Sequence, residues 1–528
     1  MSKDLTRAQK LELLEGAGFG QEKSPAVVAD GEGAAQDITD DSIIPEPGEK
    51  VKEKSPTQGE ILLQIVAGTG TSFFADEIAD LYAVIPAGGH SELLRLDGGD
   101  FKLWLQSLYY GRTGKPISAD ALAQAIGVLG AKARFDGGGP RKLSTRVAEH
   151  DGAFWYDLTN GDWQAVKITP DGWNVSNSPP VIFNRYRHQA AQVMPRQPNG
   201  KGGVEKILNY INLREGSVLF LCWLVSCFVP DIPRAMPIFY GEKGAAKSTA
   251  CEIIKAVLDP SALSTLTLQG DLRILAVSLQ QHHFLPFDNV SYISEETSDI
   301  LCRAITGSGI QQRKLHTNSD DTIFKFQRCL SINGINCAAT RPDLLDRSIL
   351  IELERISEDK RRELNDLMQN FEADRPAILG GMFGTLSEAM KIYPSVKLAS
   401  LPRMADFARW GYAIGEALGG YGDMFVQEYE RNRAAQNQEA INSDPVAFLV
   451  IEFMRGRESW SGTATNLYSE LTFIASENKI STRGKSFPQD PARLSKRLNG
   501  IKSNLEMAGV NFEKSKSGER SVTFTRRS

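Results

Sequence analysis

The sequence predicts a multidomain protein with an α+β N-terminal domain, a central α/β domain and a basic C-terminal domain. The chain has 528 residues, which allows about three domains at roughly 100–200 residues each. From residue 235 onward, short apolar strands alternate with helices, as in α/β domains. Residues 479–528 carry 12 Lys and Arg against four Asp and Glu. Such a basic end favours contact with nucleic acid, although a solvated surface would also explain it.

The composition is that of a globular protein, with 41% hydrophobic and 24% charged residues. The longest apolar run, SVLFLCWLVSCFVP at 217–230, is shorter than the roughly 18 residues of a membrane span and predicts a buried helix. The start MSKDLTRAQK lacks the apolar core of a secretion signal. The six Cys form no CxxC pair, which favours reduced core residues. We therefore expect a cytoplasmic protein with no membrane partner.

The N-terminal part divides at about residue 58. Residues 1–58 carry 12 Asp and Glu against seven Lys and Arg and predict a disordered acidic tail and linker. Residues 59–185 predict an α+β domain of unknown role. Asp97 and Asp100, in RLDGGD, are closely spaced acids that suggest the metal site of a primase. No His or basic cluster follows them, so a turn with solvated carboxylates is the better interpretation.

The stretch GEKGAAKST, residues 241–249, lies between the apolar strand MPIFY and a predicted helix. It matches the phosphate-binding template G-x-x-x-x-G-K-[ST], except that Ala246 replaces the second Gly. Glycines and a helix N-terminus direct backbone N–H groups at phosphate. Lys247 would contact the β- and γ-phosphates of ATP, and Ser248 would contact Mg²⁺. The predicted nucleotide-binding residues are Gly241, Gly244, Ala245, Ala246, Lys247, Ser248 and Thr249. A glycine-rich turn is the alternative.

An acid that can hold the metal follows about forty residues later. The apolar strand FLPF ends in Asp288, which we predict to join Ser248 in the Mg²⁺ shell. Asn289 comes next, where many such ATPases have Glu; it can orient water but cannot take up a proton. Glu295 and Glu296 are possible substitute bases, although an acidic helix start explains them equally well.

A third apolar strand, RCLSINGIN, ends at Asn333. An Asn at the tip of a strand beside the acid-bearing strand can position the attacking water or the γ-phosphate. A turn Asn before Gly334 is the alternative. The segment RPDLLDRSILIEL then places Arg347 just before another apolar strand, with Arg341 as a second candidate for a phosphate contact. Either arginine alone is also compatible with a surface charge.

These motifs, in this order, resemble AAA+ ATPases and especially the minichromosome-maintenance helicases. GEKGAAKS is similar to their Walker A loop, FLPFD to Walker B, QQRKLHTNSDDTIFKFQRCLSING to the hairpin before sensor 1, and LLDRSILIEL to the arginine-finger segment. The chain also resembles replicative ATPases of bacterial mobile elements and prophages, whose landmarks DNVS, ITGSG, PDLLDR and PRMADFA occur at 288, 305, 342 and 402. The superfamily 3 helicases of viruses share the hairpin. The resemblance covers about residues 230–420.

This resemblance implies a central α/β P-loop AAA+ ATPase domain with a helical lid, which we assign to residues 186–440. It implies ATP and Mg²⁺ as cofactors and a homo-oligomeric ring, expected to be a hexamer. Asn333 would be sensor 1, and Arg347 would reach the γ-phosphate of the neighbouring subunit. Arg403, in PRMADF, would act as sensor 2 on the nucleotide or pair locally with Asp406.

The hairpin implied by the resemblance departs from a DNA-gripping one, because its tip, Asn318 to Asp321, is acidic. DNA contacts would then come from Arg313, Lys314 and His316 on the rising arm. Exposed strand residues are the alternative interpretation.

Residues 441–528 predict a winged-helix domain that binds DNA. TATNLYSELTFIASEN predicts one helix and ARLSKRLNGIKSNLEMAG a second, with an apolar stripe. A β-hairpin around Ser517 and Gly518 follows. Phosphate contacts there would be salt-dependent and largely independent of base sequence. The candidates are Arg493, Lys496 and Arg497 on the second helix and Lys514, Lys516 and Arg520 on the hairpin. A winged helix that contacts protein is the alternative.

Together these features predict a ring-forming, ATP-dependent helicase that moves on single-stranded or forked DNA to replicate a phage or integrated mobile element. Two other functions stay open. A bifunctional primase–helicase would need primer synthesis by residues 59–185, and the missing acid cluster argues against it. A non-unwinding ATP switch, such as an origin-binding initiator or an anti-phage sensor, is favoured by Asn289 and the acidic hairpin tip. A small-molecule kinase would not need Arg347 or a basic winged helix.

Overall fold

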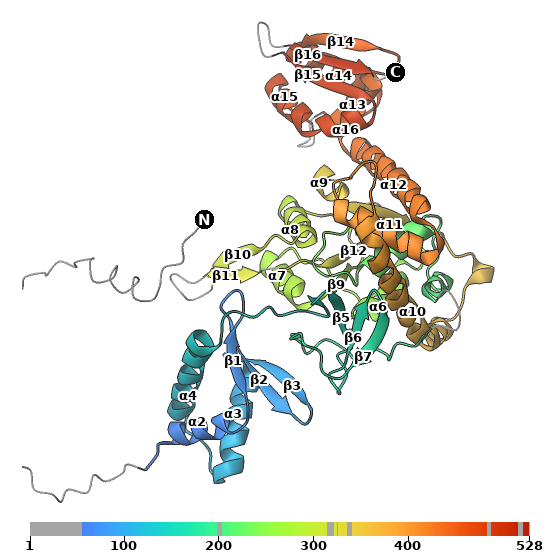
Figure 1. The fold of residues 1–528 in the computed structure, drawn as a ribbon. Helices are drawn as coiled ribbons and strands as arrows, with labels where there is room; N and C mark the ends of the chain where they lie inside the picture. The colour runs from blue at the N-terminus through green and yellow to red at the C-terminus, as the bar shows by residue number, and fades with distance from the viewer. Residues whose placement is uncertain are drawn as a thin grey trace, which may run out of the picture. The chain divides into compact units, whose positions relative to one another are not determined.

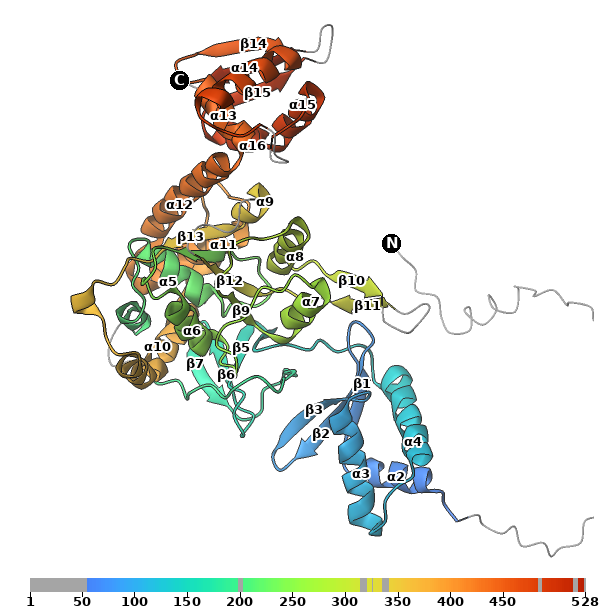
Figure 2. The ribbon, with the colours of Figure 1, turned by 180° about the vertical axis from the view of Figure 1, so that it is seen from behind.

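The computed structural model describes residues 55–197, 203–313, 321–324, 326–334, 341–482, 487–515 and 521–526. Three large hydrophobic cores organise them: one within residues 62–133, a second that runs from Phe154 to Ala440, and a third from Ile441 to Phe524. Figures 1 and 2 give the course of the chain from opposite sides. The segment 1–54, predicted as an acidic tail, lies outside the described residues.

The first described part, residues 56–136, is an antiparallel sheet with helices packed against it. The sheet has the order β1-β2-β3. Thr57 and Glu60 form a capping box that begins the first helix. Leu62, Phe101 and Leu105 are fully buried at its centre. The elements are α2 (Gln58–Ala67), β1 (Ser72–Ala75), β2 (Leu81–Ala87), β3 (His90–Arg95), α3 (Gly99–Thr113), α4 (Ala119–Ala131) and a π-helical turn (Lys132–Asp136).

A second antiparallel sheet follows, with its strands in sequence order: β4 (Val147–His150), β5 (Ala153–Asp157), β6 (Ala165–Thr169) and β7 (Gly172–Ser176). Its apolar face does not pack with the first sheet. Phe154, Tyr156 and Val166 belong to the same core as the central domain. Strands β4–β7 therefore bury their apolar face in the core that also contains the parallel sheet.

The central domain contains a four-stranded, wholly parallel sheet with the order β13-β8-β12-β9. Strands β8, β9, β12 and β13 are mainly buried, as expected for a parallel sheet with both faces covered. The strands are β8 (Met236–Tyr240), β9 (Phe284–Phe287), β12 (Cys329–Asn333) and β13 (Ser348–Glu352). The helices before and between them are α5 (Ser217–Ser226), α6 (Lys247–Leu258), α7 (Leu272–Gln281), α8 (Glu295–Thr306) and α9 (Pro342–Leu345).

A β-hairpin precedes β12, as the resemblance implied. Its arms are β10 (Ile310–Arg313) and β11 (Asp321–Phe324), paired antiparallel with Ile310 opposite Phe324. Residues 318–320 of the predicted tip and the candidate contacts Lys314 and His316 lie outside the described residues, and the last tip residue, Asp321, begins β11 opposite Arg313.

Residues after β13 are mainly helical, as predicted: α10 (Leu364–Ile392), α11 (Ala405–Gly419) and α12 (Gly422–Ser443), with short 3-10 turns at Glu358–Lys360 and Tyr393–Ser395. A further 3-10 turn, Val204–Asn209, precedes α5. Helix α12 covers the exposed edge of the sheet. The amide of Asn432 accepts from Leu350 N at 2.9 Å and donates to Leu350 O at 2.6 Å. These bonds satisfy backbone groups of the edge strand β13, which would otherwise be open to another strand.

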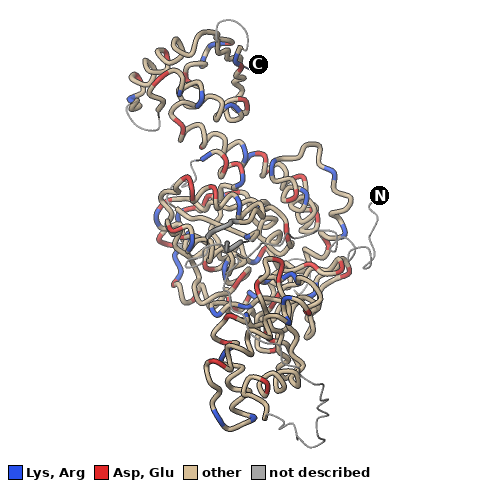
Figure 3. The backbone as a smooth tube through the Cα atoms, turned by 90° about the vertical axis from the view of Figure 1, so that its left-hand side faces the viewer, with Lys and Arg blue, Asp and Glu red and all other residues tan. Residues whose placement is uncertain are grey.

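The C-terminal part folds around a three-stranded antiparallel sheet with the order β14-β16-β15. Two features differ from the sequence prediction. The second predicted helix is broken at Ile501 into two helices, and a first strand, β14, pairs with the predicted hairpin. The elements are α13 (Pro445–Phe453), β14 (Ser459–Thr463), α14 (Ala464–Glu477), α15 (Pro491–Gly500), α16 (Lys502–Met507), β15 (Val510–Lys514) and β16 (Ser521–Arg526). Lys and Arg recur along these elements (Figure 3).

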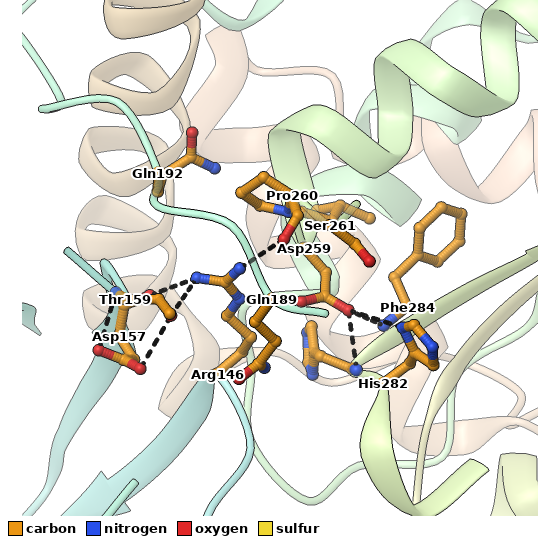
Figure 4. A network of polar contacts seen from close by, with 12 residues as sticks. Arg146, Asp157, Thr159, Gln189, Gln192, Asp259, Pro260, Ser261, His282 and Phe284 are labelled. Carbon is orange, nitrogen blue, oxygen red and sulfur yellow. Dashed lines mark hydrogen bonds and ion pairs between the residues drawn. The ribbon is translucent and has the colours of Figure 1, made fainter. Parts of the chain in front are cut away.

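A buried polar network joins the sheet β4–β7 to the central domain (Figure 4). The carboxylate of Asp259, at the end of α6, accepts from Arg146 Nε at 2.8 Å and from Lys255 Nζ at 2.7 Å. All three side chains are essentially inaccessible to solvent. Burial by itself raises the pKa of Asp259, but Lys255 and Arg146 outweigh it and hold this pKa well below its ordinary value.

The same network reaches the start of β9. Asp259 Oδ2 also accepts from the backbone N–H groups of His283 at 3.0 Å and Phe284 at 3.2 Å. Lys255 Nζ donates to Phe284 O at 2.7 Å and to His282 Nδ1 at 3.2 Å. Burial lowers the pKa of His282 to about 3, so its ring is neutral and accepts this bond. The network thus fixes the end of α6 against the first residue of β9.

Among the described residues, we found no helix with the length and apolar character needed to cross a membrane.

Substitution Asp259→Asn is expected to destabilise the central domain by about 3–5 kcal/mol, because it leaves Arg146 and Lys255 buried without a counter-charge. Since the folded pKa of Asp259 is depressed, its contribution is present above about pH 4, the unfolded value, and is lost as pH falls through the folded pKa. Urea unfolding at several pH values measures this. As a control, Glu388→Gln removes an exposed ion pair with Lys391 and should change stability by less than about 1 kcal/mol. Equal effects of the two substitutions would contradict the prediction.

Candidate functional site

The backbone of the loop between β8 and α6 adopts positive φ angles, which explains its small residues. Gly241 has a φ of +147°, and a Cβ there would lie 2.4 Å from Leu353 O. Gly244 has a φ of +87°, and Ala246 is left-handed with a φ of +56°. A left-handed residue that is not Gly costs roughly 1–2 kcal/mol. The strained Ala246 immediately precedes helix α6, whose first residue is Lys247.

Lys247 and Ser248 converge on the loop and on Asp288. Lys247 Nζ donates to Gly241 O at 2.8 Å and to Glu242 O at 2.9 Å, so its ammonium group lies over the loop. Partial burial lowers the pKa of Lys247. Ser248 Oγ donates to Asp288 Oδ1 at 3.0 Å. Asp288 follows β9, so these side chains gather at the carboxyl end of the parallel sheet, where ligands of open α/β sheets bind. The remaining predicted loop residues, Ala245 and Thr249, are buried and partly buried.

Asn333 lies at the same end of the sheet and connects the turn after β9 with helix α6. Its Oδ1 accepts from Asn289 N at 2.7 Å, and its backbone O accepts from Val290 N at 2.9 Å. Its Nδ2 donates to the Sγ of Cys251 on α6 at 3.4 Å. Asn333 is only 2% exposed. Its side chain therefore holds the turn after β9 against α6, and Asn289, with a φ of +53°, is held in a left-handed conformation.

The two candidate substitute bases begin helix α8. Ser294 caps this helix by accepting from Thr297 N. Glu295 is paired with Arg341 at 2.9 Å, and its side chain is 75% exposed. Hydrogen bonds to its own backbone N–H and to Ser294 lower the pKa of Glu296. Both carboxylates have the partners expected at a helix N-terminus.

Arg347 lies at the opposite end of the sheet from the loop. Its backbone O accepts from Met236 N, at the first residue of β8, at 2.9 Å. The five residues of β8 separate Met236 from the loop, a distance of about 16 Å at roughly 3.3 Å per residue. The Arg347 side chain is 13% exposed and is held by Asp343 Oδ1 at 2.6 Å. Arg347 therefore does not face the loop of its own chain.

Arg403 lies with Arg347. It donates to Asp346 Oδ2 at 2.9 Å and contacts Asp343 Oδ1 at 2.8 Å. The resemblance implied that Arg403 acts as sensor 2 or pairs locally with Asp406. In the structure Arg403 lies beside helix α9, where Asp343 and Asp346 bind it and Asp343 also binds Arg347. Asp343 was missed in the sequence, although its position four residues before Arg347 is the spacing of a helical ion pair.

The predicted DNA contacts are only partly described. Arg493 and Lys496 are exposed on α15. Arg493 also pairs with Asp490 at 3.3 Å. Arg497 pairs with Asp444, the residue that caps α13. Lys514 Nζ donates to Ser495 O at 2.6 Å and so joins β15 to α15. Arg313 is the last residue of β10. The described ranges exclude Lys314, His316, Lys516 and Arg520.

Two family models match the chain. Residues 204–423 match the model described as actinomycete integrative conjugative element replication protein. Residues 446–528 match the C-terminal domain of the same replication protein, RepA. Together the two segments make up more than half of the chain. The chain belongs to this family of mobile-element replication proteins. The comparison thus agrees with the resemblance to replicative proteins of mobile elements.

Other comparisons give more distant likenesses. No curated protein matches the chain. Among solved structures, the chain is similar to one titled SCCmec type IV Cch, active helicase, with 13% identity, 86% of this chain and 92% of that chain covered, and a TM-score of 0.43. It is also similar to the apo A form of the NrS-1 C-terminal region, with 10% identity, coverage of 88% and 98%, and a TM-score of 0.38.

The loop geometry separates two glycines that look alike in sequence. Gly241→Ala is expected to abolish nucleotide binding. The new Cβ would lie 2.4 Å from Leu353 O, and a φ of +147° is unfavourable for Ala. Gly244→Ala has open space around the added Cβ and should cost only about 1 kcal/mol of backbone strain. Titration with a fluorescent ATP analogue measures both. Equal loss of affinity in the two variants would contradict the geometry.

Proposed function

We propose that this replication protein is an ATP-dependent DNA helicase that assembles as a ring, moves on DNA and unwinds it. Lys247, Ser248 and Asp288 would form the ATP site, and Arg347 would complete the site of the neighbouring subunit. The observation that carries the proposal is the hydrogen bond between Ser248 and Asp288 beneath the Lys247 loop. The proposed setting is the cytoplasm of the host of a mobile element.

The residues present suit ATP and Mg²⁺. Two loop carbonyls now accept from Lys247 Nζ, and the β- and γ-phosphates would take their place as acceptors. Ser248 and Asp288 already lie within hydrogen-bond distance, as two oxygen donors to one metal shell would. Mg²⁺ would supply neutralisation of the charge that develops on the phosphates. The left-handed Ala246 leaves no bulky group between the loop and a phosphate.

The groups around the attacking water are unusual. The Oδ1 and Nδ2 atoms of Asn333 already have partners in Asn289 N and Cys251 Sγ. We therefore assign Asn333 a positioning role: it holds the turn that carries Asp288 and Asn289. The Asn289 side chain would orient the water, but it cannot accept the proton. The proton would then pass to the phosphate or to solvent, which predicts slow turnover compared with an ATPase that has a Glu there.

Arg347 and Arg403 would act on the site of a neighbouring subunit. Both are at the amino end of the sheet, about 16 Å of strand away from the loop of their own chain. A head-to-tail ring brings such opposite faces of adjacent subunits together. Asp343 and Asp346 hold the two guanidinium groups side by side, so a neighbour's γ-phosphate would have to compete with these carboxylates.

DNA would contact the hairpin β10–β11 and the C-terminal domain. The C-terminal elements combine helices with a three-stranded sheet, which supports a winged helix. Arg493 and Lys496 are exposed on α15 and suit phosphate contacts. Arg497 is better suited to hold α15 against α13, through Asp444, than to bind DNA.

A non-unwinding ATP switch that marks a replication origin is the second candidate, favoured by Asn289 in place of a base. A primase activity has less support. Asp97 receives two hydrogen bonds from Arg95, at 2.9 and 2.8 Å, and Asp100 is paired with Arg187 at 2.6 Å. Two carboxylates that are each bound by an arginine do not form a cation site together.

Strand displacement on forked DNA tests the helicase directly. The full chain is expected to separate the strands with ATP, and Lys247→Ala is expected to lower the rate about 100-fold or more, since it removes the charge that contacts the phosphates. DNA-stimulated ATP turnover without strand separation would contradict unwinding and favour the switch. Absence of turnover would mean that the loop only holds nucleotide.

Mixing two inactive variants tests whether the arginine acts between subunits. Arg347→Ala is expected to lower ATP turnover by about 10³-fold or more. An equal mixture of Arg347→Ala and Lys247→Ala subunits should regain turnover, because about one quarter of the interfaces then join an intact loop to an intact arginine. The matched control mixes Arg347→Ala with the double variant Lys247→Ala/Arg347→Ala, which restores no interface. Failure of the first mixture to recover would argue that Arg347 acts within its own chain.

A further inference from the structure

A polar cavity lies at the end of the sheet opposite the nucleotide loop. It has a volume of about 320 Å³. Its wall includes Arg234, just before β8, His283, just before β9, and Arg328, just before β12. Ligands of parallel sheets bind at the carboxyl ends of the strands, and Arg347 and Arg403 do not line this cavity, so the proposed ATP sites give no reason for its basic residues.

Arg234 is buried without a carboxylate partner. The residue is only 3% exposed. Its Nη2 donates to Val229 O, its Nη1 lies 3.2 Å from Cys329 Sγ, and its Nε has no hydrogen-bond partner in the structure. Within the described part of the chain, no carboxylate lies within ion-pair distance of it. Fully buried arginines are rare unless they are paired.

Arg328 is partly buried and has no carboxylate partner either, as far as the described ranges extend. Its guanidinium donates only to backbone carbonyls: Leu279 O at 2.7 Å, Gln280 O at 3.0 Å and Gln327 O at 3.0 Å. These carbonyls orient the group but carry no net charge. Two arginines thus bring two positive charges to one cavity.

Other charged groups also line the cavity. Lys142 and Asp231 both line it and pair with each other. Glu77 also lines it. His283 Nε2 bonds to Cys227 O at 2.9 Å. Burial opposes ionisation of Cys329, but its hydrogen bond with Cys227 and the charge of Arg234 lower the pKa of this thiol.

We propose that this cavity binds a phosphate group, to which Arg234 and Arg328 present their positive charge. The cavity also borders Gly307 and Gln327, on either side of the hairpin β10–β11. A phosphate there would lie at the base of the hairpin. Its source is either a DNA strand or a free phosphate compound, and the experiment below distinguishes them. The inference does not depend on ATP hydrolysis.

The test uses the full chain with Lys247→Ala as background, which removes the main phosphate contact of the nucleotide loop. Arg234→Met is then added, because Met keeps much of the volume and removes the charge. Without phosphate, this change should leave the Tm unchanged or raise it, since an unbalanced buried charge is lost. The matched control is Arg375→Met. The Arg375 side chain is also mostly buried, at 11% exposure, but it is paired with Glu372, so its loss should lower the Tm.

Two titrations follow. Inorganic phosphate should raise the Tm of the background protein and of the Arg375→Met control, and this rise should be absent with Arg234→Met. That result identifies a free phosphate compound as the ligand. If phosphate has no effect but Arg234→Met lowers the salt dependence of single-stranded DNA binding by about one phosphate contact, the ligand is a DNA strand. Neither effect, or an equal phosphate effect with and without Arg234, would overturn the proposal.

If Arg234→Met does not fold, Lys142→Glu provides the same test from the rim. This side chain is 53% exposed, so the substitution is tolerated more easily. The added negative charge should abolish the phosphate-dependent rise in Tm or weaken DNA binding. An unchanged response in both titrations would overturn the proposal equally well.

Discussion

The carboxylate of Asp259 is the point on which the central domain depends, because it fixes helix α6 at the end far from the nucleotide loop. It binds Lys255 of the same helix, Arg146 of the preceding segment and two N–H groups at the start of β9. At its other end, α6 is tied to the end of β9 through Ser248 and Asp288. Helix and strand are therefore joined at both ends, by buried polar bonds at Asp259, whose loss is costly, and by an exposed hydrogen bond beside the loop.

The parallel sheet separates two kinds of chemistry. Its carboxyl ends carry the loop, Asp288 and Asn333, which together suit a nucleotide. Its amino ends carry Arg347, Arg403 and the cavity of Arg234 and Arg328. In a head-to-tail ring this separation is useful, because one end of a subunit meets the other end of the next. The proposed phosphate site would place an anion near the base of the hairpin, at the end of the sheet away from ATP bound to the same chain.

The sequence was a good guide where one short segment carries a whole motif. MPIFY before GEKGAAKST, FLPF before Asp288 and the strand ending at Asn333 each place polar residues at the end of an apolar strand. This local order brings Lys247, Ser248, Asp288 and Asn333 to the carboxyl end of the sheet. It was a poor guide where partners lie far apart along the chain. Nothing near Arg403 indicates that Asp343 and Asp346 hold it, and the Cys251 contact of Asn333 spans 82 residues.

Local patterns were enough for the strand–loop–helix, the hairpin arms, the helical region after β13 and the basic C-terminal end, because backbone propensity and hydrophobic periodicity act over a few residues. Packing between distant segments decided the rest. The strands β4–β7 joined the core of the central domain because their apolar face is buried there with Phe383 and Trp410. The break at Ile501, the pairing of β14 and the burial of Arg234 were decided in the same way. Each depends on which side chains meet in space, and burial determines that only when the whole chain is folded.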